Sequence, residues 1–424
     1  MRKIVLIQIT VFFTVLSVLP AFAEYQDKYA VIEGLIAEAI RNNPELRSFE
    51  SRIDAYEQRP SQERALDDPR LKLAFLNLPT DSFRFDQEAM TQKFIQVMQK
   101  IPYPGKRDLK GDIAEKDIAI ATAEFDEKRN SLIRQIKVLY NNLLYLDLAL
   151  KITGETRILL AEFIKTAETG YAAGKGEQRE ILKARIELSR IIKRIIALEQ
   201  KRATTTAYMN TLLSRHLQKE FHVTGSLDQT PLVFTFQELQ KIAEENRPVL
   251  RGMKQKIEQS RLAIDLAEKE YYPDMDFGMS YGQRDDSDTD HRPDFVSASV
   301  TINIPLWHET KERRKVSEKR AQQRQAEEQF NSLRNSIDYR LKELLSKIDM
   351  HNQDIELIKT GFIPQSTLSL ESAMSGYRVN KVDFLTLINN QINLYNYRID
   401  YYRAIADREN SITELEEAVG RRLF

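Results

Sequence analysis

Histidine and cysteine side chains supply many of the metal ligands, nucleophiles and general bases of proteins. The chain has five histidines, with no H-E-x-x-H motif and no pair at i,i+4 spacing. They are His216, His222, His291, His308 and His351. There is no cysteine, which excludes disulfides, thiolate sites and lipidation of an N-terminal cysteine. The sequence therefore predicts no catalytic residue, no metal site and no cofactor.

The most acidic stretch, RDDSDTD at 284–290, could attract a cation. It lacks the glycine and the terminal Glu of an EF-hand loop, so we expect a solvated loop instead. The motifs G-x-S-x-G, Walker A and G-x-G-x-x-G are absent, which argues against hydrolase, ATPase and dinucleotide chemistry. Acidic and basic residues balance at 63 each, so no overall field favours nucleic acid. We expect neither an enzyme nor a nucleic-acid partner.

Residues 296–304, VSASVTINI, alternate between apolar and small polar side chains, which is typical of a strand with one oily face. Three similar stretches precede it, so strands are expected at about 70–78, 92–101, 273–283 and 294–304. The segments that follow each pair carry apolar residues at steps of three and four, as in coiled coils. A helix from about Asp108 to Thr153 would be roughly 65–70 Å long. The predicted fold class is mixed and mainly α.

The chain is internally duplicated. KIPYPGKR at 100–107 returns as NIPLWHET at 303–310, and GYAAGKGEQREIL at 170–182 returns as GYRVNKVDFLTLI at 376–388. Two further pairs of segments match in the same order at nearly the same offset. Repeats are therefore predicted at 24–215 and 235–424, joined by a linker at 216–234 that lacks helical periodicity.

The first 23 residues have a positive start, an apolar run and a final A-x-A site, which predicts a cleaved secretory signal peptide. No later apolar run is long enough for a transmembrane helix, so an exported chain of this kind enters a membrane only as a closed barrel. Four strands cannot close a barrel, whereas three copies would supply 12. Tyr103 and Trp307 follow two of the strands, where an aromatic belt would meet outer-membrane lipid.

The duplication, the IPYPGKR junction and the GY..G hairpin signature resemble those of the TolC-like outer-membrane efflux proteins, over residues 29–420 or so. The resemblance implies a homotrimer with a 12-stranded transmembrane barrel and a long periplasmic tunnel of helical hairpins. It also implies docking on a periplasmic adaptor (membrane fusion) protein and an inner-membrane pump, with passive conduction of substrate. The PGKR form is similar to the CzcC-like branch, which serves heavy-metal exporters of the RND type.

The resemblance also implies roles for residues of the hairpin tips. Adaptor docking is expected at Gly170, Tyr171, Gly174, Gly376 and Tyr377. The second tip departs from the family pattern, because Asn380 stands where a glycine is usual. Candidates for a gate at the tunnel mouth are Glu371, Lys381 and Asp383, although Glu371 could equally be a solvated carboxylate on a helix face. The basic cluster after the strands could meet anionic lipid or simply aid solubility; it comprises Lys106, Arg107, Lys311, Arg313, Arg314 and Lys315.

Two other functions fit parts of the sequence. A duct of a type I secretion system for polypeptides would look nearly the same. A soluble periplasmic coiled-coil scaffold or adaptor would explain the helices, but the uncharged small polar face of 296–304 argues against it. Metal ions and small toxic compounds are both possible cargoes, and nothing in the sequence separates them.

Overall fold

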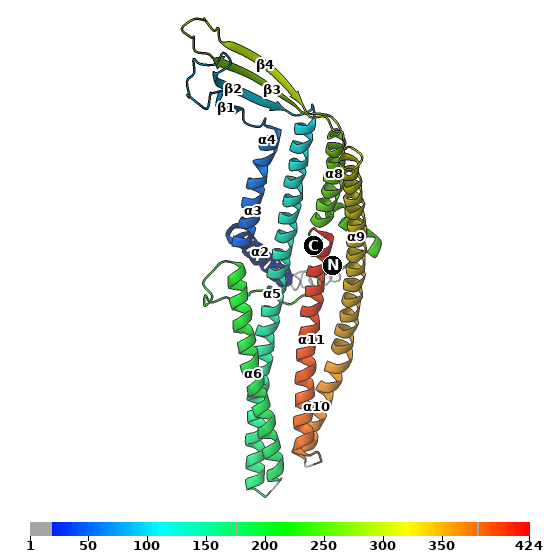
Figure 1. The fold of residues 1–424 in the computed structure, drawn as a ribbon. Helices are drawn as coiled ribbons and strands as arrows, with labels where there is room; N and C mark the ends of the chain where they lie inside the picture. Colours follow the sequence, from blue (N-terminus) through cyan, green and yellow to red (C-terminus); the bar gives the residue numbers. More distant parts are fainter. Residues whose placement is uncertain (1–18, 175–176, 380) are drawn as a thin grey trace, which may run out of the picture. The chain divides into compact units, whose positions relative to one another are not determined.

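The computed structural model describes residues 19–174, 177–379 and 381–424, so most of the predicted signal peptide lies outside them. The described chain is mainly helical and contains a four-stranded antiparallel sheet (Figure 1), which confirms the expected fold class at that level. The first half forms α2 (Leu19–Asn42), α3 (Pro44–Glu57), α4 (Arg59–Arg64), β1 (Arg70–Leu76), β2 (Gln92–Ile101), α5 (Lys106–Ala172) and α6 (Gln178–Leu212). The second half forms α7 (Phe236–Asn246), α8 (Pro248–Lys269), β3 (Met275–Gln283), β4 (Phe295–Ile302), α9 (Glu312–Leu357), the π-helix η1 (Ile358–Phe362), α10 (Ile363–Arg378) and α11 (Phe384–Val419).

The four strands pair in the order β1-β2-β3-β4, all antiparallel. The central pairing, β2 with β3, joins the two halves of the sequence from Lys93 to Ile101. β1 ends two residues earlier than expected because Asn77 takes a positive φ of 54° and its side chain donates to the Met90 carbonyl. The chain therefore leaves the strand at Asn77 and enters the loop to β2.

The chain divides into two compact units, and each unit takes segments from both halves. The sheet unit comprises Phe49–Glu124 and Val249–Leu333 and contains all four strands. The helical unit comprises Met1–Ser48, Phe125–Pro248 and Arg334–Phe424. The predicted repeats and the compact units thus divide the chain differently, because each half supplies two of the four strands and one helical hairpin.

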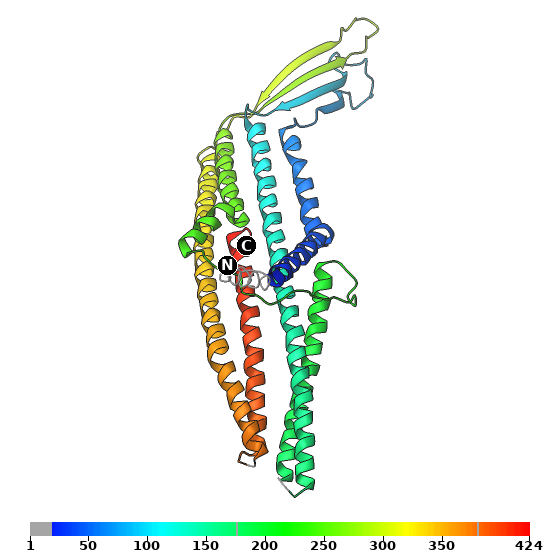
Figure 2. The same cartoon turned by 180° about the vertical axis from the view of Figure 1, so that it is seen from behind.

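One core cluster of the helical unit lies between two hairpins, α5/α6 and α10/α11, which Figures 1 and 2 show as pairs of adjacent helices. Leu160 of α5, Ala184 of α6 and Phe384 of α11 are fully buried in one cluster. The seam expected on α5 is buried as well, from Leu132 to Leu146. α5 does not stop near Thr153: it runs on to Ala172, with the Thr153 hydroxyl bonded to the Ala149 carbonyl inside the helix.

The second hairpin contains an irregular turn that the sequence analysis did not predict. Between α9 and α10 the chain forms η1, and Pro364 follows directly in the first turn of α10. Proline has no N–H to donate, and a π-turn accommodates the disturbed ladder without ending the helix. The ring of Phe362 stacks on Tyr397 of α11 at 4.8 Å between centroids, which fixes the turn against its neighbour.

The segment between α6 and α7, expected as a linker at 216–234, contains no helix or strand and is held by specific bonds. The buried ion pair of Arg408 and Glu409 holds the linker at Thr230. Glu409 accepts from the N–H and hydroxyl of Thr230, and Arg408 donates to the Thr230 carbonyl. Tyr140 of α5 donates to the Thr224 carbonyl at 2.7 Å. Because its polar groups find these partners, the linker packs without regular structure.

Candidate functional site

The sheet has two faces of opposite character. One face carries apolar side chains in register across the strands, for example Leu73 beside Ile95, and Tyr281 beside Val296. These side chains are exposed, with Leu73 at 69%. The other face carries small and polar residues such as Gln96, Ser280 and Ser297. An exposed apolar face opposite a polar face is the reverse of a soluble half-buried sheet, and it suits a wall between lipid and water.

The outer edges of the sheet are open. β1 and β4 are the terminal strands, and neither has a second partner among the described strands. Such edges present unpaired N–H and C=O groups, which act as templates for pairing with another chain.

The junction from β2 to α5 is locked by the motif PGKR. Gly105 has φ +84°, which turns the chain so that Lys106 points inward. The Lys106 ammonium is buried and donates to the Asp274 carboxylate at 2.7 Å and to the Tyr272 carbonyl at 2.9 Å. Burial alone would raise the pKa of Asp274, but bonds from Lys106 and from the Tyr103 N–H outweigh it and hold the pKa below its usual value. Asp274 directly precedes β3 and Lys106 is the first residue of α5 after β2, so opposite charges near the ends of these two strands could have indicated the pair.

The ring of Tyr103 stacks on Tyr272, 4.5 Å apart and 12° from parallel, with the Lys269 ammonium over its face. Tyr103 and Trp307, expected together in an aromatic belt, therefore have different surroundings. Trp307 follows β4 with 75% of its surface exposed, and Leu306 beside it is 71% exposed. The side chains of the first junction are buried or stacked, whereas those of the second are exposed. We call the first the closed junction and the second the open junction.

The first hairpin tip lies at the end of α5. Gly170 and Tyr171 belong to its last turn, and Gly174 has φ +75° after it. The N–H of Gly174 donates to the Tyr171 carbonyl, a bond that closes the helix end. Positive φ explains the glycine at 174, while residues 175–176 of the turn lie outside the described residues.

The second tip is built by close packing. Gly376 lies in α10, and a Cβ there would stand 2.5 Å from Cγ2 of Val382. The Lys381 N–H donates to the Gly376 carbonyl at 2.8 Å. Tyr377 lies against Phe384, and burial raises the pKa of its hydroxyl. Asn380 lies outside the described residues.

The three gate candidates have different surroundings in the single chain. The Asp383 carboxylate caps α11, accepting from the Thr386 N–H at 2.6 Å, and this bond lowers its pKa. Glu371 and Lys381 are exposed, and neither side chain bonds to another described residue. The pair suggested for Lys381 and Asp383 is not formed within this chain, and a pair between chains stays a prediction.

Acidic side chains of the loop at 284–290 bond to residues of the same unit. Asp285 pairs with Lys93 at 3.0 Å, and Asp286 accepts from His291 at 3.0 Å, which raises the pKa of His291. In the facing loop the Arg84 guanidinium lowers the pKa of Asp86 to about 2. No group of three or more metal-ligating side chains occurs among the described residues. These contacts fit a solvated, internally bonded loop.

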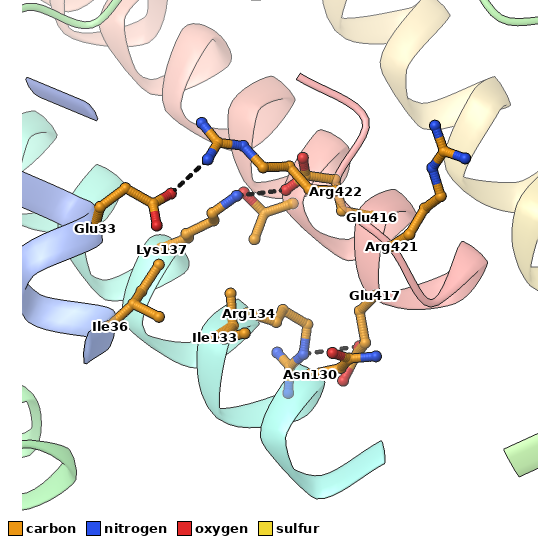
Figure 3. A pocket seen from close by; sticks show the side chains of 11 residues that line it. Glu33, Ile36, Asn130, Ile133, Arg134, Lys137, Glu416, Glu417, Arg421 and Arg422 are labelled. Carbon is orange, nitrogen blue, oxygen red and sulfur yellow. Dashed lines mark hydrogen bonds and ion pairs between the residues drawn. The ribbon is translucent and has the colours of Figure 1, made fainter. Parts of the chain in front are cut away.

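A charged cavity of about 140 Å³ lies between α2, α5 and α11 in the helical unit (Figure 3). Its walls are ion pairs: Lys137 with Glu416 at 2.6 Å, and Arg134 with Glu417 at 2.9 Å. Arg422, near the last residue of the described chain, reaches Glu33 at 2.7 Å. These charges are paired across the cavity, which fastens the end of α11 to α2 and α5.

No helix in the described part of the chain is long and apolar enough to cross a lipid bilayer.

Residues 35–215 and 239–421 match the family described as outer membrane efflux protein. The chain belongs to this family. The prediction of an outer-membrane efflux channel is thereby confirmed, and outer membrane efflux proteins form a channel family rather than an enzyme family.

One relative of this outer membrane efflux protein is the cobalt-zinc-cadmium resistance protein CzcC of Cupriavidus metallidurans, 20% identical over 409 residues, which are 96% of this chain and 93% of that protein. Two solved structures share the fold. The outer-membrane channel OprN has a TM-score of 0.78 at 14% identity, over 95% of this chain and 92% of that one. CusC has a TM-score of 0.77 at 13% identity, over 92% of each chain. The resemblance to TolC-like proteins and their heavy-metal branch is confirmed.

Proposed function

We propose that three copies of this chain form the outer-membrane duct of a tripartite efflux system. Each copy contributes four strands, and β4 of one copy pairs with β1 of the next to close a 12-stranded transmembrane barrel. The two-faced sheet with open edges is the observation that carries the proposal, because unpaired edges are not tolerated in lipid. The apolar face meets lipid, and the polar face lines a water-filled lumen.

Exposed apolar residues of the hairpins support assembly of the helical unit. α5 and α6 expose Ile158, Ile186 and Ile196 on the side away from their buried cluster. α9 and α10 expose Leu357 and Leu368. Apolar stripes on both sides of a hairpin pair are expected where helices of neighbouring copies continue the wall.

The periplasmic tips would receive an adaptor protein that connects the duct to an inner-membrane pump of the RND type. The tip residues would present the docking surface, and the duct would conduct passively; they are Gly170, Tyr171, Gly174, Gly376 and Tyr377. Replacing Gly170 or Gly376 with a bulky residue should abolish adaptor crosslinking while the trimer persists; normal crosslinking in both variants would refute this assignment.

Divalent metal ions are the proposed cargo, with the likeness to a cobalt-zinc-cadmium resistance protein as support. Deleting the coding sequence should lower the tolerated concentration of cobalt, zinc or cadmium, and returning it should restore growth. Unchanged metal tolerance together with lost tolerance to organic compounds would reassign the cargo and leave the duct in place.

The test of the assembly is fractionation followed by light scattering. Membranes are separated on a density gradient, and the protein mass is measured after detergent extraction. We expect outer-membrane protein with a mass near three times the signal-free portion of the 49.4 kDa chain. A monomeric species free of membranes would contradict the proposal and favour a periplasmic scaffold.

Glu371 would form an acidic ring at the mouth of the trimeric duct, where three carboxylates focus a cation-attracting field. Glu371→Ala should raise single-channel conductance, by weakening closure, and reduce cation preference. Glu356→Ala, an exposed carboxylate on α9, is the matched control. Conductance and selectivity equal to those of the wild type would remove the gate role.

A further inference from the structure

The turn between β4 and α9 presents apolar side chains outward. Ile304, Leu306 and Trp307 are each at least 71% exposed. This exposure does not come from a loose backbone. The Trp307 carbonyl accepts from the N–H groups of Thr310 and Lys311 at 3.1 Å, and also from the Thr310 hydroxyl. The turn is hydrogen-bonded internally and holds its apolar side chains away from the unit.

The apolar surface continues the outward face of β4. Side chains alternate along a strand, and Val300 and Ile302 lie on the exposed apolar face of the sheet. Beyond the strand end the Leu306 N–H donates to the Ile304 carbonyl at 2.9 Å, so the backbone turns there and the strand alternation ends. The exposed apolar residues of the turn thus directly follow the surface assigned to lipid in the proposed function, on which this inference rests.

Two cations next to the apolar residues have weak internal partners. The Lys311 side chain is 78% exposed, and its ammonium lies 3.5 Å from the buried Glu312. Arg314 is exposed and forms no hydrogen bond or ion pair with another described residue, although Glu309 lies within electrostatic reach. Arg313 and Lys315, in contrast, pair with Glu309 at 2.5 Å and Glu270 at 2.6 Å.

We propose that this turn is a binding surface for anionic phospholipid. Leu306 and Trp307 enter the acyl–headgroup boundary, and Lys311 and Arg314 bind phosphate-bearing headgroups above it. An indole prefers this boundary because it has an apolar body and one polar N–H. Exposed cations beside a membrane attract anionic lipids, and anionic headgroups would complement the two cations better than an apolar surface would.

The equivalent turn of the first half does not share this role. Lys106 is buried on Asp274, and the Tyr103 ring is stacked on Tyr272. The contact with anionic headgroups is therefore assigned to the turn of the second half alone, and each copy of the chain contributes one such turn.

Trp307 is the single tryptophan of the chain, so intrinsic fluorescence reports on this turn without a label. The purified protein is reconstituted in phosphatidylcholine vesicles that contain an equal fraction of either brominated phosphatidylcholine or brominated phosphatidylglycerol. We expect both lipids to quench Trp307 and phosphatidylglycerol to quench it more strongly. Each cation should contribute about fivefold to the local enrichment of the anionic lipid.

The variant Lys311→Gln/Arg314→Gln should quench equally with the two lipids, and high salt should have the same effect on the wild type. The control is Lys315→Gln, one turn further along α9, whose charge is engaged by Glu270. It should keep the preference for phosphatidylglycerol.

Equal quenching of the wild type by both lipids would overturn the proposal, as would an equal loss of preference in the control. Emission already blue-shifted in detergent and unquenched by either lipid would mean that a second copy covers Trp307, and would overturn it too. Co-flotation of the protein with the vesicles is measured first. Failure to incorporate would count against the proposed duct, whereas incorporation without quenching counts against this inference alone.

Discussion

The two halves of the chain each carry a strand into a helix, and they do so in different ways. After β2, a positive-φ glycine and a buried Lys106–Asp274 pair close the junction. After β4, a hydrogen-bonded turn leaves Trp307 exposed. The local sequences IPYPGKR and IPLWHET align position by position. Two segments that align in sequence therefore need not share the same side-chain packing. The first junction holds the base of the sheet through buried contacts. The second junction exposes its apolar side chains to the surroundings.

The hairpin tips differ in a similar way. The first tip depends on Gly174 in the left-handed region, and α6 then begins at Gln178, whose N-cap residue Glu177 forms no side-chain cap bond. The second tip depends on close packing of Gly376 with Val382, and Asp383 caps α11. Turn geometry fixes one tip, whereas side-chain contacts fix the other, so substitutions at matched positions should have unequal effects.

The largest effect is expected from Lys106→Met. It leaves the Asp274 carboxylate without its main partner in a poorly hydrated site, at a cost of about 3 kcal/mol in unfolding free energy. Urea unfolding of the detergent-solubilised protein, followed by circular dichroism, measures it. Arg314→Met at the second junction should change the value by less than about 0.5 kcal/mol, because Arg314 is exposed and forms no hydrogen bond or ion pair with another described residue. Equal losses at both positions would remove the distinction between closed and open junctions.

A smaller effect is expected from Gly105→Ala, about 1–2 kcal/mol of destabilisation in the same measurement. Its φ of +84° is unfavourable for alanine, and the new Cβ would lie 3.1 Å from Cε of Lys269. Gly154→Ala in α5 is the control, because a Cβ there meets no atom within 4 Å and the helix favours alanine. The two changes should have opposite signs; destabilisation by both would point to a general intolerance.

Much of the fold could be predicted from sequence because its determinants are local. Alternation at 296–304 marked β4, and the steps from Leu132 to Leu146 marked the buried seam of α5. The pairing of Lys106 with Asp274 depends on residues 168 apart, which no periodicity connects. The helix was predicted too short because Gly154 is of a type that often follows the last helical residue. A glycine within a packed helix costs only about 1 kcal/mol, and α5 continues to Ala172. Contacts between copies remain predictions, because they lie outside a single chain.

The capping difference predicts a loss of about 1 kcal/mol in α11 on Asp383→Ala, because the Thr386 N–H loses its acceptor. Hydrogen exchange at the first turn of α11 would measure it. Glu177→Ala, at the matched position before α6, should change exchange there by less, since Glu177 forms no cap bond and its one ion pair among the described residues is with exposed Arg179. Comparable loosening of both helices would contradict the assignment of the second tip to side-chain contacts.

The finest test of the closed junction is the dependence of its stability on acidic pH. The pKa of Asp274 in the folded chain lies below the usual value of 3.8, which applies to the unfolded chain. The ionised carboxylate therefore stabilises the fold fully above pH 3.8, and this contribution is lost as the pH falls through the lower folded value. Asp274→Asn should flatten stability over that acidic range. Glu309→Gln at the open junction should not, because Glu309 is fully exposed and water screens its pair with Arg313. If the Glu309 variant flattened the curve as much as the Asp274 variant, the acid response would belong to surface charge in general, and the closed junction would lose its special place in the fold.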